Sequence, residues 1–176
     1  MINVYNGSIL NAKTDFIMHQ VNCQSVMGSG VAKVLRDFNE GIFTHYQAVS
    51  ERRKLQNISL LGDNDYYWLI NHDKKQCIVS MFAQDKYGYD GNQYTDYEAF
   101  RTCLRQFKAS WSAWVEDIDK NNNKTLRRIS VALPYNIGCG RGGGDWEEIL
   151  KIITTELVDY DIELWRLDEL EVSNER

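Results

Sequence analysis

The chain contains 176 residues, of which 43% are hydrophobic, so it can bury one full core, whereas two independent domains would each be small. Its formal net charge of −5 and its pI near 5.2 give no overall positive field, which argues against binding nucleic acid as a polymer. We therefore expect a single domain over residues 1–167, followed by an acidic, frayed C-terminal tail over residues 168–176.

The sequence carries no sign of a membrane or of an oxidising compartment. No apolar run approaches the roughly 20 residues that a membrane helix needs, and residues 1–5 lack the basic and apolar regions of a signal peptide. The four cysteines form no CxxC pair and no Cys/His cluster, which favours reduced, buried thiols over disulfides or a zinc site. We expect a cytoplasmic monomer with no metal, no cofactor and no membrane partner. Two short basic runs, residues 52–54 and 127–128, leave a local contact with nucleic acid open.

The first part of the chain alternates β-rich runs with a helical pattern. Residues 2–5 and 16–21 are short and β-rich, and turn-forming residues separate them, so we expect two strands. Gly30 then precedes apolar residues that recur at helical spacing from Val31 to Phe38, which predicts a helix.

The middle of the chain predicts a hairpin and then a helix. Residues 66–70 and 76–82 are β-rich, and the polar stretch between them suits a hairpin turn. Thr95 or Asp96 is placed to cap the next helix, with Glu98 as the capping-box partner of Thr95. The apolar face of this helix recurs through Phe100, Cys103, Leu104, Phe107 and Trp111.

The last part of the chain completes the alternation of strands and helices. Residues 117–125, which include three adjacent asparagines, predict a polar loop. The alternating pattern of residues 129–133 predicts a strand that ends at Pro134. A helix over residues 145–157 and a final strand over residues 162–167 follow. This order indicates a three-layer α/β/α sandwich with a central mixed β-sheet.

Two glycine-rich segments, residues 27–30 and 138–144, each follow an expected strand and precede an expected helix. In α/β sheets, ligands bind at the carboxyl ends of the strands, which is where these segments lie. Glycine allows positive φ and a close approach of the backbone, so successive N–H groups can form an anion-binding concavity. The pattern predicts a phosphate or diphosphate site, with purely structural turns as the alternative. It is not a Walker loop, since no GK[ST] follows, and it is not a dinucleotide fingerprint, since no GxGxxG opens the first strand–helix unit.

Five further motifs follow one another along the chain: Gly7-Ser8-Ile9-Leu10, Met18-His19-Gln20-Val21-Asn22-Cys23, Met27-Gly28-Ser29-Gly30-Val31-Ala32, Leu133-Pro134-Tyr135-Asn136-Ile137-Gly138-Cys139-Gly140 and Asp145-Trp146. Their order and spacing resemble the macro domain family over nearly the whole chain up to Leu167. A further pair of motifs, residues 81–84 and 95–97, is similar to the branch that contains the terminal ADP-ribose glycohydrolase, the yeast ADP-ribose-1''-phosphate phosphatase and many phage proteins.

The resemblance implies ADP-ribose or a derivative as the ligand, and it implies roles for individual positions. Asn22 would orient the distal ribose, which an amide can do by donating and accepting, or would merely stabilise a turn. Ile9 would lie beside adenine, and Trp165 would offer it an aromatic face or pack in the core. His19 would be linked to catalysis or be a structural histidine. The implied ligand-binding positions are Ser8, Ile9, Asn22, Gly28, Ser29, Gly30, Val31, Gln84, Asn136, Ile137, Gly138, Cys139, Gly140, Arg141, Gly142 and Trp165, and the implied catalytic positions are Asn22 and His19.

The chain also departs from the family pattern. Ser8 stands where many macro domains have an aspartate that accepts from the adenine amino group. Gln84 and Gly142 stand where the terminal glycohydrolase has the lysine and the aspartate of its covalent mechanism, so neither the amine nor the carboxylate is present. Asp85 and Asp145 are alternative water activators, although Asp145 is well explained as a helix cap.

The resulting expectation is a hydrolase that uses an ordered water, with His19 as a proton carrier. It would act as an ADP-ribose-1''-phosphate phosphatase or as an ADP-ribosyl hydrolase. The alternatives are a non-catalytic ADP-ribose-binding module, an enzyme that removes ADP-ribose from nucleic acid, and an interaction protein that keeps the fold but not the ligand. Tyr87, Tyr89 and Tyr94 could cover the distal ribose or pack on the surface, and we favour packing.

Overall fold

The computed structural model describes residues 1–71, 74–118 and 123–167, so residues 72–73 of the expected hairpin turn and the expected tail over residues 168–176 lie outside it. The described residues form a six-stranded mixed sheet and a separate two-stranded sheet. In the larger sheet all neighbouring pairs are parallel except β3 and β4. Its strands lie in the order β1 (Ile2–Asn6), β8 (Asp161–Arg166), β7 (Ser130–Pro134), β2 (Phe16–Asn22), β4 (Lys74–Gln84) and β3 (Asn64–Asn71).

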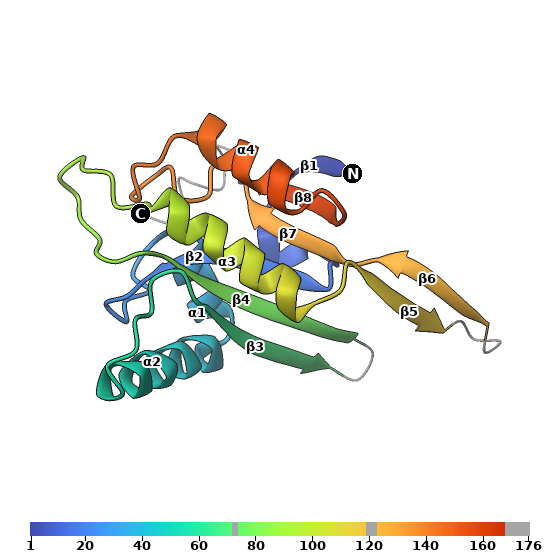
Figure 1. The fold of residues 1–176 in the computed structure, drawn as a ribbon, viewed down its shortest axis with the longest axis horizontal. Helices are drawn as coiled ribbons and strands as arrows, with labels where there is room; N and C mark the ends of the chain where they lie inside the picture. Colours follow the sequence, from blue (N-terminus) through green and yellow to red (C-terminus); the bar gives the residue numbers. More distant parts are fainter. Residues whose placement is uncertain (72–73, 119–122, 168–176) are drawn as a thin grey trace.

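Helices cover both faces of this sheet, which confirms the three-layer architecture expected from the sequence (Figure 1). Successive side chains of a strand point to opposite faces, and β2 shows how this divides the core. The helices are α1 (Gly30–Phe38), α2 (Glu40–Leu55), α3 (Tyr97–Ser110) and α4 (Trp146–Glu156). Phe16 and Met18 pack in the cluster that includes α3 and α4, whereas Ile17 and Val21 pack in the cluster that includes α1 and α2.

None of the helices in the described ranges has the length and hydrophobicity to span a bilayer. All four cysteines are free, and three of them are buried. Burial raises the pKa of the Cys23 thiol to about 12. The expectation of reduced, buried thiols is therefore confirmed for those three.

The expected helix after residue 95 is present as α3, and its cap is Asp96. The Asp96 carboxylate accepts a hydrogen bond from the Ala99 N–H at 2.9 Å. Thr95 instead donates its hydroxyl to the carbonyl oxygen of Gly138 at 2.7 Å. The capping box of Thr95 with Glu98 is therefore wrong, because a distant loop holds the Thr95 side chain.

The sequence pattern did not predict α2, which begins directly after α1. Asn39 ends α1, and its side chain caps α2 by accepting from the Gly41 N–H at 2.9 Å. Within α2 only Ile42, Tyr46 and Ser50 are buried, and they lie four residues apart. This stripe is too narrow and too polar to give the broad apolar face by which surface helices are recognised.

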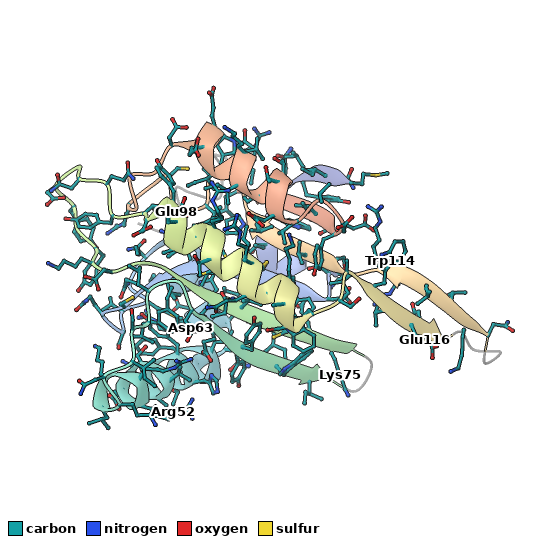
Figure 2. All side chains as sticks on the ribbon, viewed as in Figure 1. Arg52, Asp63, Lys75, Glu98, Trp114 and Glu116 are labelled. Carbon is teal, nitrogen blue, oxygen red and sulfur yellow. The ribbon has the colours of Figure 1, made fainter. Side chains whose placement is uncertain are left out.

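Of the polar loop expected over residues 117–125, residues 119–122 lie outside the described part of the chain, and the expectation is wrong for residues 117–118 and 124–125, which are in strands. β5 (Trp114–Ile118) and β6 (Lys124–Arg128) pair antiparallel and project away from the main sheet as an arm (Figure 1). Trp114 and Glu116 lie on this arm, away from the helices (Figure 2). Cross-strand pairing and a long-range anchor, rather than local propensity, stabilise this segment.

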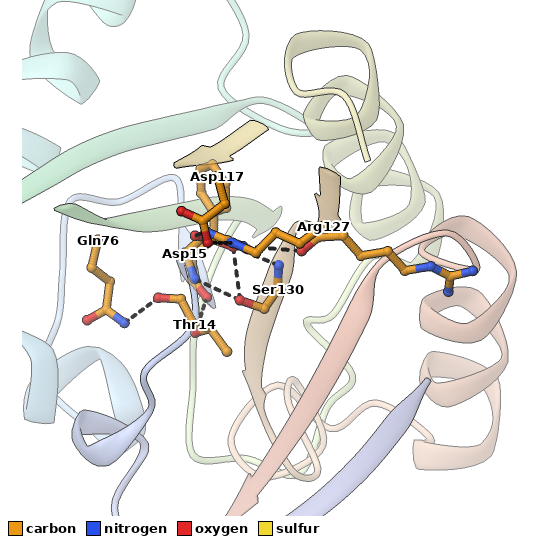
Figure 3. Close-up of polar contacts among 8 residues, drawn as sticks. Thr14, Asp15, Gln76, Asp117, Arg127 and Ser130 are labelled. Carbon is orange, nitrogen blue, oxygen red and sulfur yellow. Dashed lines mark hydrogen bonds and ion pairs between the residues drawn. The ribbon is translucent and has the colours of Figure 1, made fainter. Parts of the chain in front are cut away.

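That anchor is a carboxylate at the start of β2, shown in Figure 3. Asp15 accepts two hydrogen bonds from the Arg127 guanidinium, both at 2.7 Å. It also accepts from the backbone N–H and the hydroxyl of Ser130 at 2.9 and 3.0 Å. Burial raises the pKa of Asp15, but the hydrogen bonds from Arg127 and Ser130 together outweigh burial and hold it below the ordinary value. The arm is thus tied to the sheet by a bidentate, charge-assisted contact.

We expect Asp15→Asn to lower the free energy of unfolding by about 1–2 kcal/mol, because an amide cannot accept bidentate bonds from Arg127. Urea unfolding at pH 7 measures this loss. Since the folded-state pKa of Asp15 is depressed, the stabilisation is present above the ordinary pKa of 3.8 and is lost as the pH falls below it.

Asp117→Asn is the matched control, because Asp117 is 59% exposed and accepts one bond from Arg127 at 3.2 Å. We expect it to change stability by less than about 0.5 kcal/mol. Equal losses in the two variants would show that Asp15 is not the anchor.

Candidate functional site

A cavity of about 350 Å³ opens at the carboxyl ends of β7, β2 and β4, where both glycine-rich loops begin. The position agrees with the rule that α/β sheets bind ligands at strand ends. Of the implied site residues, His19, Asn22, Gly28, Ser29, Gly30, Val31, Gln84, Asn136, Ile137, Gly138, Gly140, Arg141 and Gly142 line it. Lining residues that the sequence reasoning did not assign to the site include Gln20, Val26, Tyr87, Tyr89 and Tyr135.

The first loop presents an uncapped helix N-terminus to the cavity. Ser29 is the N-cap of α1, yet its side chain makes no cap hydrogen bond. Within the described residues, the N–H groups of residues 28–32 donate to no protein group. Gly30 has φ +56, and a Cβ there would meet nothing within 4 Å, so the backbone faces open space. In contrast, the N-cap side chains of the other described α-helices, Asn39, Asp96 and Asp145, all accept a cap bond.

The second loop is folded tightly upon itself and tied to the segment before α3. The Gly144 N–H donates to the Gly138 carbonyl at 2.9 Å, and the Thr95 N–H donates to the Gly142 carbonyl at 2.8 Å. A Cβ at Gly138 would lie 2.6 Å from the Gln20 Oε1 atom, so this position has no room for a side chain. Within the described residues, the N–H groups of Gly138, Gly140, Arg141 and Gly142 donate to no protein group. The loop is therefore rigid and still offers free backbone donors.

A side-chain network connects this loop to the strands. Gln20 on β2 donates its amide to Gln84 Oε1 at 2.7 Å and to the Thr95 hydroxyl at 2.8 Å. The Thr95 hydroxyl in turn donates a hydrogen bond to the Gly138 carbonyl. In the described structure the Oε1 atom of Gln20 is buried and accepts no hydrogen bond. Alternation along β2 places Gln20 on the same face as Met18, which is the signal that could have assigned it to the site.

The amide of Asn22 is largely engaged by its own turn. Its Oδ1 atom accepts from the N–H groups of Gln24 and Val26 at 2.9 and 3.3 Å, and its Nδ2 atom donates to the Val26 carbonyl at 2.7 Å. The Tyr46 hydroxyl also lies 3.2 Å from Oδ1. An amide nitrogen carries two hydrogens, so one donor of Asn22 remains for a ligand.

His19 lies at the base of the cavity but is not placed as a proton carrier. Its ring is 1% exposed, and Nε2 lies 2.9 Å from the Ser80 hydroxyl. Burial lowers the pKa of His19 to about 3, so the ring is neutral near pH 7 and holds no exchangeable charge. This geometry favours the structural interpretation of His19.

Four implied residues do not line the cavity. The Ser8 hydroxyl accepts from the Leu10 N–H at 3.4 Å as the cap of the short 3-10 helix Ile9–Asn11, and Ile9 itself is 4% exposed in the core. Cys139 donates to the Ile137 carbonyl, and burial raises its pKa to about 11. Trp165 stacks on Tyr5 at 5.0 Å between ring centroids and donates to Glu163.

The tyrosines after β4 lie partly against the cavity. Tyr87 and Tyr89 line it, which favours the alternative that they cover a bound ligand. Tyr94 does make a local contact, since its hydroxyl donates to the Asp90 carboxylate at 2.9 Å. Neither Asp85 nor Asp145 lines the cavity. Among its described lining residues there is no carboxylate and no lysine, and Arg141 is the one fixed charge.

Comparison with known proteins supports the macrodomain fold. No protein-family model matches the chain. Two curated proteins named DNA ADP-ribosyl glycohydrolase, from Mycobacterium bovis (strain BCG / Pasteur 1173P2) and Mycobacterium tuberculosis (strain ATCC 25618 / H37Rv), are 26% identical to it over 152 residues. The match covers 85% of this chain and 36% of each relative, so the chain spans only about a third of their length.

Solved structures match over almost the whole chain. The macrodomain of Mycobacterium tuberculosis DarG has a TM-score of 0.70 at 21% identity, covering 94% of this chain and 97% of that one. A Bacteroides thetaiotaomicron protein of unknown function has a TM-score of 0.71 at 22% identity, with coverages of 95% and 98%. Thermosipho africanus DarTG in complex with ADP-ribose has a TM-score of 0.67 at 14% identity, with coverages of 96% and 42%. The chain therefore has the macrodomain fold, and the resemblance seen in its sequence is confirmed.

We expect the His19 ring to stay neutral from pH 8 to pH 5, so its NMR ring resonances should not shift over this range. The depressed folded-state pKa of His19 also affects stability. Below about pH 6.5 the imidazole binds a proton in the unfolded chain, whereas it stays neutral in the folded protein. Stability should fall on this account by up to about 1.4 kcal/mol per pH unit as the pH drops from 6.5 towards 3. His19→Gln should remove this part of the slope. A His19 titration midpoint between pH 6 and 7 would restore the proton-carrier role.

Proposed function

We propose that this chain, which has the macrodomain fold, binds the ADP-ribosyl group in the cavity between its two glycine-rich loops. The observation that carries the proposal is the uncapped N-terminus of α1, which lies against the cavity. Its N–H groups have no protein partner within the described residues, and the helix dipole adds positive potential. Phosphate groups satisfy both features.

The second loop makes a diphosphate a better fit than a single anion. Its free N–H groups, at Gly138 and at residues 140–142, lie along the same cavity as the α1 N-terminus. Two sets of donors from separate loops suit two linked phosphates. The volume of about 350 Å³ lies within the roughly 300–1,000 Å³ typical of small-molecule sites.

The cavity crosses three neighbouring strand ends, so an elongated nucleotide can lie across them. We place the adenosine towards β7, where Tyr135 and Ile137 offer apolar surface, and the distal ribose towards β4. On that side Asn22 keeps one amide donor, which suits a ribose hydroxyl.

Removal of an ADP-ribosyl group by hydrolysis is the second candidate function. It is supported by the names of the curated relatives, and nucleic acid bearing ADP-ribose is among the substrates to test. Gln84 has no amine with which to form a covalent intermediate, so in this scheme water attacks the anomeric carbon of the distal ribose. The bond from that carbon to the attached group breaks, and the leaving group takes the bonding electrons and the proton that the water loses. Asn22 would orient the ribose, and the free backbone donors would hold the diphosphate.

The phosphate site can be tested with Ser29→Asp. The Ser29 backbone is extended, with φ −160 and ψ 166, so an aspartate can cap α1 there and should stabilise the protein by about 0.5–1 kcal/mol. The same carboxylate should repel the diphosphate and weaken ADP-ribose binding by at least about tenfold. Thermal unfolding and titration calorimetry measure the two effects.

Ser29→Asn is the control, because asparagine also caps helices but carries no charge. We expect it to bind ADP-ribose more tightly than Ser29→Asp does. If the aspartate variant binds as well as the asparagine variant, the α1 N-terminus is not the phosphate site.

Hydrolysis can be tested by supplying ADP-ribose-1''-phosphate, ADP-ribosylated protein and ADP-ribosylated DNA to the purified chain. We expect turnover of at least one substrate, with Asn22→Ala reducing the rate by about tenfold or more through lost orientation. Asp85→Asn should leave the rate unchanged, because Asp85 does not line the cavity. If ADP-ribose binds but no product forms, the chain is a non-catalytic binding module. If Asp85→Asn abolishes turnover, Asp85 is the base that activates the water.

A further inference from the structure

Helix α2 places a fully buried phenol, that of Tyr46, next to the end of β2. The Tyr46 ring is stacked on that of Phe82 on β4, with 5.5 Å between the centroids. Its hydroxyl donates to the backbone carbonyl of Asn22 at 2.5 Å and lies 3.2 Å from the Asn22 Oδ1 atom. Burial raises the pKa of the Tyr46 phenol above its ordinary value of 10.0, so the group keeps its proton near neutral pH and remains a donor.

The contacts around Asn22 fix which way its amide faces. The Oδ1 atom accepts from the Val26 N–H at 3.3 Å, while Nδ2 donates to the Val26 carbonyl at 2.7 Å. Rotating the amide by 180° would set its oxygen against the Val26 carbonyl and its NH2 group against the Tyr46 hydroxyl. The oxygen therefore faces the protein, and the second hydrogen of Nδ2 is left for the cavity that Asn22 lines.

The turn that follows Asn22 has a backbone conformation that side chains rarely adopt. Ser25 has φ +63, in the left-handed region that favours glycine. Such a residue persists where neighbouring contacts hold the backbone, and α2 supplies such contacts on both sides of it. The Tyr46 hydroxyl holds the Asn22 carbonyl before the turn, and the Gln47 amide donates to the Ser25 carbonyl at 3.5 Å. α2 thus supports the residue that the proposed function assigns to the distal ribose.

We propose that Tyr46 is a positioning residue whose hydroxyl holds the Asn22 amide in the orientation that offers a donor to the distal ribose. Through this contact it sets the preference of the site for ADP-ribose over ADP. The inference rests on the proposed function. ADP has the same adenosine and diphosphate but lacks the distal ribose, so misplacing the Asn22 amide affects only ADP-ribose. A residue that merely stabilised the fold or the first glycine-rich loop would affect both ligands alike.

The test measures the affinities of ADP-ribose and of ADP by titration calorimetry in the wild type and in Tyr46→Phe, which removes only the hydroxyl. We expect Tyr46→Phe to weaken ADP-ribose binding by about five- to tenfold and ADP binding by less than about twofold. In an Asn22→Ala background the same substitution should have no further effect on ADP-ribose binding, because residues that act through one contact are not additive. Thermal unfolding checks that each variant is folded at the temperature of the titration.

Tyr160→Phe is the matched control, since Tyr160 is also buried and donates its hydroxyl to a backbone carbonyl, that of Trp111, at 2.6 Å. Its ring packs on that of Phe107, and it does not line the cavity. We expect it to preserve both affinities. If the wild type does not bind ADP-ribose, the proposed function fails. If ADP-ribose binds but Tyr46→Phe weakens both ligands equally, or behaves like Tyr160→Phe, only the positioning inference fails.

A second measurement needs the wild type alone and therefore does not depend on the stability of any variant. In NMR spectra, adding ADP-ribose should shift the side-chain NH2 resonances of Asn22, because the distal ribose accepts from this group. ADP should leave them in place, although it shifts backbone amides in both glycine-rich loops. Equal shifts of the Asn22 NH2 resonances with both ligands would overturn the inference.

Discussion

The site depends on backbone N–H groups that the fold brings together and leaves without protein partners. Unpaired donors are costly when they are buried, so they persist only where water or a ligand can reach them. Here they occur at the start of α1 and in the second glycine-rich loop, and both open onto one cavity. Ser29 could supply a side-chain cap and does not, which leaves the dipole of α1 directed at the cavity.

The rest of the fold holds these donors in place. β2 ends between β4 and β7 and delivers the first loop, while the Gln20 and Thr95 side chains fix the second loop from behind. At Gly138 the backbone has φ +74 and almost touches Gln20, so no other residue fits without moving the network. Such rigidity benefits binding, because little conformational entropy is lost when a ligand enters a site that is already formed. The tie between Asp15 and Arg127 lies at the other end of β2 and supports the arm, not the cavity.

Much of this arrangement could be predicted from the sequence, for identifiable reasons. The period of the apolar residues identified α1 and α3, and the glycines at strand ends indicated the two loops. The sequence pattern did not predict α2, because only a narrow stripe around Tyr46 is buried. It did not predict the β5–β6 arm either, because the anchor Asp15 is more than a hundred residues away from Arg127 in the chain. Tyr89 became a lining residue only through the path of the loop after β4. The resemblance left open whether Trp165 faces adenine or packs in the core, and the pattern gave no sign that its ring stacks on Tyr5, a neighbour set by strand pairing.

The central claim is that these backbone donors bind the phosphates of ADP-ribose, and an amide-resolved NMR titration tests it most directly. Adding ADP-ribose to ¹⁵N-labelled protein should shift the amide resonances of residues 28–32 and 138–142 together and saturably. Hydrogen bonding to an anion should move amide protons at the start of α1 more than those in the body of the helix. Resonances in both loops that stay in place at saturating ADP-ribose, or shifts confined to the β5–β6 arm, would contradict the account.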